Sequence, residues 1–240
     1  MKILIFSDLH LCDKRNSLEY EENRKKKLAE FIKSTNPEIV VNLGDTVSRK
    51  EFLRDNYSCE ADAFDTYLEW RKQFEIPFIE CSIEREFDFF AQKMKQPMDH
   101  FYKCDNYMSI ITVAPKFEND HNFSSEQILF IKESINNCTT PNILIASHVP
   151  YPGSCSRPIA QGIFLTIPEE LRKHVEESTK KIFWCGGHFH WQEEAPKQLG
   201  SLTAFYGGRF NFENHNTPGY MRIIDTQSGE ISTILSNFNW

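Results

Sequence analysis

The sequence has no apolar stretch long enough to cross a bilayer. Lys2 leads directly into the first apolar run, so we expect no secretory signal peptide. The seven cysteines are odd in number and scattered, and they form no Cys-x-x-Cys pair. These absences predict a reduced, cytoplasmic protein with no membrane contact and no structural zinc site.

The sequence also has no excess of positive charge, no internal repeats and no low-complexity segments. Its net charge of −7 disfavours broad electrostatic binding to nucleic acid. No linker divides the chain, and 240 residues suit one large domain or two small ones. We therefore expect a single domain over residues 1–240.

What the chain does contain is a series of buried apolar runs that end in polar residues. The first run, residues 3–6, is followed by Asp8 and His10. In an extended chain, residues two apart point to the same side, so a carboxylate and an imidazole leave this predicted strand together. Both groups are good ligands for Mn, Fe or Zn.

The second run repeats this pattern. A predicted helix whose apolar residues lie between Tyr20 and Ile32 ends at Asn36-Pro37, and the run at residues 38–43 is followed by Gly44-Asp45. In a β-α-β unit the two strands are parallel, so we expect Asp45 at the same sheet edge as Asp8 and His10.

Later runs end in further candidate ligands. We expect helices around 64–74, through the Phe-rich residues 87–102, from the capping box at Ser124, and from about Pro168. Predicted strands are followed by the turn at Ser82, by His148, and by Gly187-His188-Phe189-His190. The strands are expected at residues 76–79, 107–113, 142–147, 181–185, 202–206, 220–224 and 231–235.

In this order, the motifs resemble those of the calcineurin-like metallophosphoesterase superfamily. Its signature runs Asp-x-His, Gly-Asp, Gly-Asn-His-Asp/Glu, His and Gly-His-x-His, each after a strand. The resemblance extends from Ile3 to about His190 and implies an α/β fold. We expect a four-layer αββα sandwich, in which two mixed sheets pack face to face and helices cover the outer faces.

The resemblance also implies a site for two divalent ions, expected to be Mn, Fe or Zn. Asp45 would bridge the ions, and a bridging hydroxide would attack phosphorus. Asp45, His148 and His188 are the residues we expect to carry catalysis. The full expected ligand set is Asp8, His10 and His190 for the first ion, Ser82, His148 and His188 for the second, and Asp45 for both.

The sequence departs from the family at one turn, which reads Cys81-Ser82-Ile83-Glu84. Ser82 replaces a ligand amide, so we expect the second ion to bind more weakly. Ile83 replaces the histidine that the family pattern assigns to phosphate stabilisation or leaving-group protonation. Glu80 or Glu84 could serve as a ligand instead, although a solvent-exposed carboxylate or an outer partner is the alternative for both.

The expected activity is hydrolysis of a small phosphoester, a phosphodiester or a phosphorylated metabolite. A catalytically impaired protein that binds a phosphorylated ligand or a protein partner is the alternative, and a nuclease is third. The oligomeric state is left open. Arg157 and Arg209 could clamp a phosphate, although such arginines are more often surface residues, and His215 could supply a replacement acid. Cys12 is expected to be a packed thiol near the metal site, and residues 24–27 are expected to form a solvated basic face rather than a phosphate-binding patch.

Overall fold

Two mixed β-sheets form the centre of the molecule. The structure, a computed structural model, describes residues 1–81, 83, 87–95, 97–115, 122–154, 164–188, 195–209 and 219–235. Within these residues the first sheet has the order β10-β11-β1-β2-β3, and β12 also pairs with β11. The second sheet has the order β4-β5-β6-β7-β9-β8.

The first sheet is built on three parallel strands, β1 (Lys2–Phe6), β2 (Ile39–Asn42) and β3 (Phe78–Glu80). Their carboxyl ends therefore meet at one edge, where the predicted ligands follow. The antiparallel strands of this sheet are β10 (Gly208–Arg209), β11 (Tyr220–Asp225) and β12 (Ile231–Leu235).

The second sheet also has a parallel centre. It consists of β5 (Met108–Thr112), β6 (Asn142–Ser147), β7 (Lys181–Gly186) and β9 (Leu202–Tyr206). The antiparallel edge strands are β4 (His100–Lys103) and β8 (Lys197–Leu199). The carboxyl ends of β6 and β7 lead to His148 and His188.

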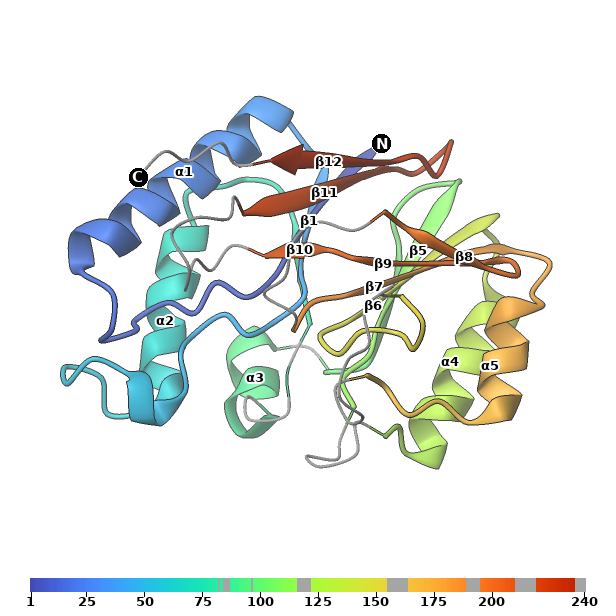
Figure 1. Ribbon diagram of the computed structural model, residues 1–240, viewed down its shortest axis with the longest axis horizontal. Coiled ribbons are helices and arrows are strands. Elements are labelled where there is room, and N and C mark those ends of the chain that lie inside the picture. The colour runs from blue at the N-terminus through green and yellow to red at the C-terminus, as the bar shows by residue number, and fades with distance from the viewer. Residues whose placement is uncertain are drawn as a thin grey trace.

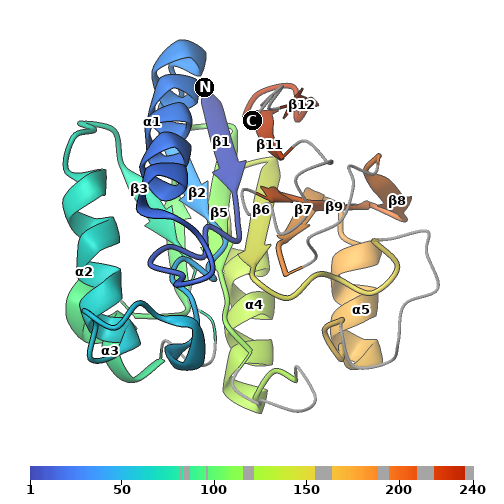
Figure 2. The ribbon, with the colours of Figure 1, turned by 60° about the vertical axis from the view of Figure 1, so that its left-hand side comes forward.

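Side chains that alternate along the strands explain the layers. Ile3 and Ile5 of β1 pack between the sheets with Leu144 and Ala146 of β6. The intervening residues Leu4 and Phe6 face the helices α1 (Leu18–Thr35), α2 (Glu60–Arg71) and α3 (Phe87–Met94). On the other side, β6 packs on α4 (Ser125–Asn137) and α5 (Glu169–Glu176). Figures 1 and 2 show this arrangement, which confirms the predicted four-layer sandwich.

The helix boundaries follow local chemistry. Ser17 caps α1 by accepting a hydrogen bond from the Tyr20 N–H, and Asn36 ends the helix in a left-handed conformation just before Pro37. Ser124 and Gln127 form the predicted capping box of α4. Within the described residues, no helix is long and apolar enough to cross a membrane.

Several local expectations were wrong. The helix in the Phe-rich stretch ends at Met94, and residues 100–103 form strand β4, which pairs with β5. The short 3₁₀ helix at residues 50–52 and strands β8 and β10 were not predicted. On α4 the buried apolar side includes the expected Ile135 together with Ile131, whereas Leu129, also expected on that side, is exposed.

Candidate metal centre

The predicted ligands lie on backbone that non-glycine residues seldom adopt. Among the described non-glycine residues seven have positive φ, and four of these are the predicted ligands Asp8 (58°), His10 (44°), Asp45 (54°) and His188 (69°). Such conformations cost roughly 1–3 kcal/mol each and persist where the surrounding structure enforces them, often at functional sites. This concentration makes the segments after β1, β2 and β7 a candidate functional site.

Backbone hydrogen bonds join the first two of these segments. The N–H groups of Asp8, His10 and Leu11 donate to the carbonyl oxygens of Gly44, Asp45 and Thr46, at 3.1, 3.1 and 2.9 Å. The two ligand-bearing segments are therefore fixed to one another residue by residue.

Two glycines permit close approaches around the site. Gly44 has a φ of 97°, and a Cβ there would lie 2.9 Å from Cγ2 of Ile83 and 3.0 Å from the carbonyl oxygen of Cys81. A Cβ on Gly187 would lie 2.0 Å from Oγ of Ser7. A side chain at either position would push apart the segments that carry the predicted ligands.

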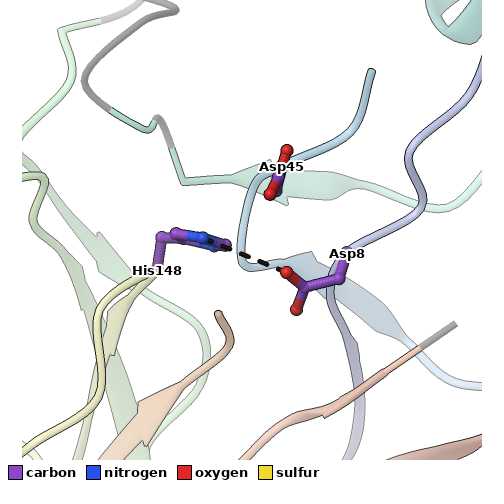
Figure 3. Close-up of side chains that lie close together, drawn as sticks. All are labelled: Asp8, Asp45 and His148. Atoms are coloured by element: carbon purple, nitrogen blue, oxygen red, sulfur yellow. Dashed lines mark ion pairs between the residues drawn. The ribbon is translucent and has the colours of Figure 1, made fainter. Parts of the chain in front are cut away.

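Asp8, Asp45 and His148 place their ligand atoms within 4.8 Å of one another (Figure 3). Nε2 of His148 lies 4.0 Å from Oδ1 of Asp8. Nε2 of His10 lies 3.3 Å from Oδ2 of Asp45 and 3.9 Å from Oδ1 of Asp8. Side chains from both sheets thus meet at a single point, with Asp8 fully buried.

His188 completes the group from β7. Its Nδ1 lies 3.2 Å from Nε2 of His148, and its backbone N–H donates to Oδ2 of Asp8 at 3.1 Å. Two nitrogens that each bind one ion at about 2.0–2.1 Å are roughly 3–3.4 Å apart, so this spacing suits a shared ion. The contact with Asp8 also fixes the left-handed backbone of His188.

The tautomer of His148 follows from its partner. Its Nδ1 lies 3.1 Å from the carbonyl oxygen of Leu43, which can only accept a hydrogen bond, so Nδ1 carries the proton. The lone pair of Nε2 is then directed toward Asp8 and His188. A backbone partner of this kind is typical of metal-binding histidines, because it fixes both tautomer and ring orientation.

The donor set fits a divalent cation. Two carboxylates of low exposure lie within reach of one another and repel when both are ionised, and a bound cation would relieve that repulsion. The surrounding nitrogen ligands suit Mn, Fe or Zn better than Mg. The described part of the chain therefore provides a coherent donor set for a divalent cation.

Five of the seven predicted ligands lie together in this group, namely Asp8, His10, Asp45, His148 and His188. Ser82 and His190 lie outside the described residues, as do Glu84, Arg157 and His215. Arg209 belongs to β10. Cys12 is a fully buried thiol whose Sγ lies near the carbonyl oxygen of Ala63, and burial raises its pKa.

Glu80 is neither exposed nor part of the ligand group. Its buried carboxylate accepts hydrogen bonds from the Tyr67 hydroxyl at 2.6 Å, Nη1 of Arg71 at 2.8 Å and Nδ2 of Asn42 at 2.8 Å. Oδ1 of Asn42 in turn accepts from the Gly44 N–H at 3.2 Å. Burial raises the pKa of Glu80, although Arg71, Tyr67 and Asn42 act in the opposite direction. Glu80 is therefore an outer partner of the Gly44-Asp45 turn.

Sequence reasoning missed three residues whose side chains bind backbone next to the predicted ligands. Asn42 accepts from the Gly44 N–H, Glu21 accepts from the Cys12 N–H, and Arg24 donates to the Leu9 carbonyl oxygen. A signal was available for the two helical residues, because Arg24 precedes the buried Leu28 by four positions and Glu21 precedes it by seven. That spacing places both charged residues on the buried face of α1.

The chain was compared with known proteins. The model of the calcineurin-like phosphoesterase family matches residues 1–192. One similar solved structure is a dimetal phosphatase from Danio rerio, with a TM-score of 0.67 and 12% sequence identity over 99% of each chain. No curated protein matches the chain. Because the family match spans most of its length, the protein belongs to the calcineurin-like phosphoesterase family.

Proposed function

We propose that the protein hydrolyses a small phosphoester, a phosphodiester or a phosphorylated metabolite, at the centre formed by Asp8, Asp45 and His148. The observation that carries this proposal is the convergence of their ligand atoms within 4.8 Å, at the strand ends where the family signature places metal ligands. We also infer that residues 1–240 act as one domain.

The proposed ligand roles follow the family pattern. Asp8 and His10 would hold one ion together with His190, and His148 and His188 would hold a second ion together with Ser82. Asp45 would contact both. Two bound divalent ions would offset the charge of the phosphoryl group and make a bound water more acidic. The chain's own contribution is orientation, since Leu43 fixes the His148 ring and Asp8 fixes the His188 backbone.

Ile83 bears on the leaving group. It is largely buried, and its Cγ2 lies against Gly44, next to the proposed bridging ligand Asp45. A hydrocarbon side chain has no proton to donate, so a leaving group near position 83 must depart without its help. We infer a steep dependence of rate on leaving-group pKa, because a general acid typically contributes 10²–10⁴-fold.

The test combines metal binding with a substrate series. Mn²⁺ titration of the metal-stripped protein should give one tight site and one weaker site. Aryl phosphodiesters should be hydrolysed faster than alkyl phosphodiesters in Mn²⁺, and Asp45→Asn should abolish both the binding and the hydrolysis. The double variant Ser82→Asn with Ile83→His should gain most on alkyl esters.

Two results would contradict the proposal. Hydrolysis of no ester by metal-loaded protein would favour the alternative of a protein that binds a phosphorylated ligand or a partner. A flat dependence on leaving-group pKa in the unmodified protein would mean that another residue supplies the acid, with His215 as the first candidate to replace.

A further inference from the structure

Helix α1 buries a cation against the backbone between the predicted ligands Asp8 and His10. Arg24 is 1% exposed, which overturns the expectation of a solvated face at this residue. Its Nη2 donates to the carbonyl oxygen of Leu9, whereas Nε and Nη1 have no hydrogen-bond partner among the described residues. Its guanidinium lies 5.7 Å from the ring centre of Tyr20. Burying a charge this way costs several kcal/mol, so its contact with Leu9 calls for an explanation.

Glu21 lies one turn earlier on the same face of α1 and contacts the same segment. Its Oε2 accepts a hydrogen bond from the Cys12 N–H at 2.8 Å, and it forms an ion pair with Nη1 of Arg54 at 3.0 Å. Helix α1 therefore supplies one donor and one acceptor to the backbone that follows β1. The donor meets a carbonyl group, and the acceptor meets an N–H group two peptides later.

The segment held in this way alternates in conformation. Asp8, His10 and Cys12 have positive φ, whereas the side chains of Leu9 and Leu11 are buried in the core below α1. From the other side, the backbone of residues 44–46 accepts the hydrogen bonds of the segment's N–H groups. The segment is thus clamped between α1 side chains and the turn that carries Asp45.

We propose that Arg24 and Glu21 are positioning residues that set the orientation of His10 and Asp8 in the metal centre. The Leu9 carbonyl belongs to the planar peptide that joins Leu9 to His10, so holding its oxygen fixes ψ of Leu9 and φ of His10 together. Rotation of that peptide would move the His10 ring away from Asp45, from which it is now 3.3 Å. This proposal rests on the proposed function, because it assigns a purpose to the geometry of the ligands.

If Arg24 had only a structural role, its replacement by an apolar residue would be expected to give a different result. Replacing a buried charge by an apolar residue of similar volume is often neutral or stabilising. Positioning instead requires that Arg24→Met loosen the segment and weaken metal binding even if the melting temperature stays constant or rises. Because only one guanidinium nitrogen has a hydrogen-bond partner among the described residues, a single lysine ammonium should replace it in part.

The experiment compares Arg24→Met, Arg24→Lys and the control Ile32→Val, which removes buried volume from the same helix two turns away. Hydrogen exchange of the Asp8, His10 and Leu11 amides is measured in metal-free protein, and Mn²⁺ affinity is measured by calorimetry. Arg24→Met should speed exchange at these amides and lower Mn²⁺ affinity about 10–100-fold, as loss of an outer partner typically does. Arg24→Lys should retain most of both properties, and Ile32→Val should lower only the melting temperature.

The outcomes separate this inference from the proposed function. Unchanged amide exchange in Arg24→Met would overturn the inference, and so would equal losses of Mn²⁺ affinity in Arg24→Met and Ile32→Val. Absence of Mn²⁺ binding to the unmodified protein would instead overturn the proposed function, while metal-free exchange would still decide whether Arg24 holds the segment. If Arg24→Met does not fold, Glu21→Leu with Glu21→Gln as control should speed exchange of the Cys12 amide only in the leucine variant, and equal exchange in both would overturn the inference.

Discussion

The two halves of the sandwich bury different chemistry. We define the first half as the first sheet with α1 to α3 and its loops, and the second half as the second sheet with α4, α5 and its loops. The described buried Asp, Glu and Arg residues all belong to the first half, and they are Asp8, Asp13, Glu21, Arg24, Glu80 and Arg222. The described part of the second half buries no such residue, and its outer core is lined by residues such as Ile131, Ile143 and Leu171.

The buried charged residues occur where the backbone adopts conformations that non-glycine residues rarely adopt. In the first half, Asp8, His10 and Asp45 all have positive φ, and buried polar side chains hydrogen-bond to the backbone of neighbouring residues. In the second half, His148 follows β6 without positive φ, and the left-handed His188 is held by Asp8 of the first half. We therefore expect the buried charged groups of the first half to lower its stability, whereas the second half supplies apolar packing.

Among the variants that compare the two halves, Asp8→Asn has the largest expected effect. Mn²⁺ affinity should fall more than about 100-fold, because loss of an outer partner alone costs 10–100-fold. The metal-free protein should become more stable, since a buried carboxylate close to Asp45 is removed and the amide oxygen can still accept from His188. Calorimetry and thermal melting in chelator measure the two effects.

Asp13→Asn is the matched control for this prediction. Asp13 is buried in the same segment, but it pairs with Arg15 and Ser48 rather than with the ligand group. Its replacement should lower stability with and without metal. A decrease in metal-free stability for Asp8→Asn would show that the buried Asp8 carboxylate does not lower the stability of the first half.

Ile131→Ala tests the second half. Ile131 of α4 is fully buried in the core that α4 forms with the second sheet, so its truncation should lower the free energy of unfolding by about 2–4 kcal/mol. Mn²⁺ affinity under native conditions should not change. Leu28→Ala, in the outer core of the first half four residues after Arg24, should cost similar stability and also weaken Mn²⁺ binding. Equal Mn²⁺ affinities in the two variants would contradict the division between the halves.

Much of the fold could be predicted because buried parallel strands appear as short apolar runs. The run at residues 3–6 forms β1, the run at 142–147 forms β6, and the polar residues after them meet as expected. Parallel strands place their carboxyl ends at one edge, so sequence order alone brings Asp8 and Asp45 together. The convergence of the described candidate ligands could therefore be predicted without knowledge of any contact.

The rest depended on contacts that local sequence does not encode. Phe101 and Tyr102 could belong to a packed helix or a strand, and pairing with β5 decides for the strand. Burial of Glu80 depends on Tyr67 and Arg71 of α2, which reach it only in the folded protein. Positive φ at Asp8 and His10 is likewise imposed by tertiary bonds, since non-glycine residues rarely adopt it unaided.

A smaller effect is expected for Glu80→Gln. The carboxylate accepts from three side chains, and the neutral amide would weaken its bond with Arg71, so we expect a loss of about 2 kcal/mol in stability. Mn²⁺ affinity should fall severalfold, because Asn42 links Glu80 to the Gly44 N–H. Denaturant unfolding and calorimetry test this. An unchanged Mn²⁺ affinity would show that the hydrogen bonds of Glu80 and Asn42 do not affect metal binding.

The smallest effect concerns Asp105, a half-buried carboxylate in the turn between β4 and β5 of the second half. Burial acts to raise its pKa, but hydrogen bonds from the Thr226 hydroxyl and the N–H groups of Tyr107 and Met108 hold the pKa below its usual value. A carboxyl group whose pKa is lowered by folding adds stability above its unfolded pKa of about 3.9, and that stability is lost as the pH falls through the folded value.

Asp105→Asn should therefore lower stability by about 1 kcal/mol at neutral pH, because the amide is a weaker acceptor than the carboxylate. The difference between the variant and the unmodified protein should disappear at low pH, where Asp105 is also neutral. Urea midpoints at pH 7 and at successively lower pH values measure this, and Thr226→Val should shift the loss to higher pH by removing one donor. A difference that stays constant with pH would mean that the Asp105 charge contributes nothing. In that case the contrast between the halves would extend from fully buried carboxylates to this half-buried one.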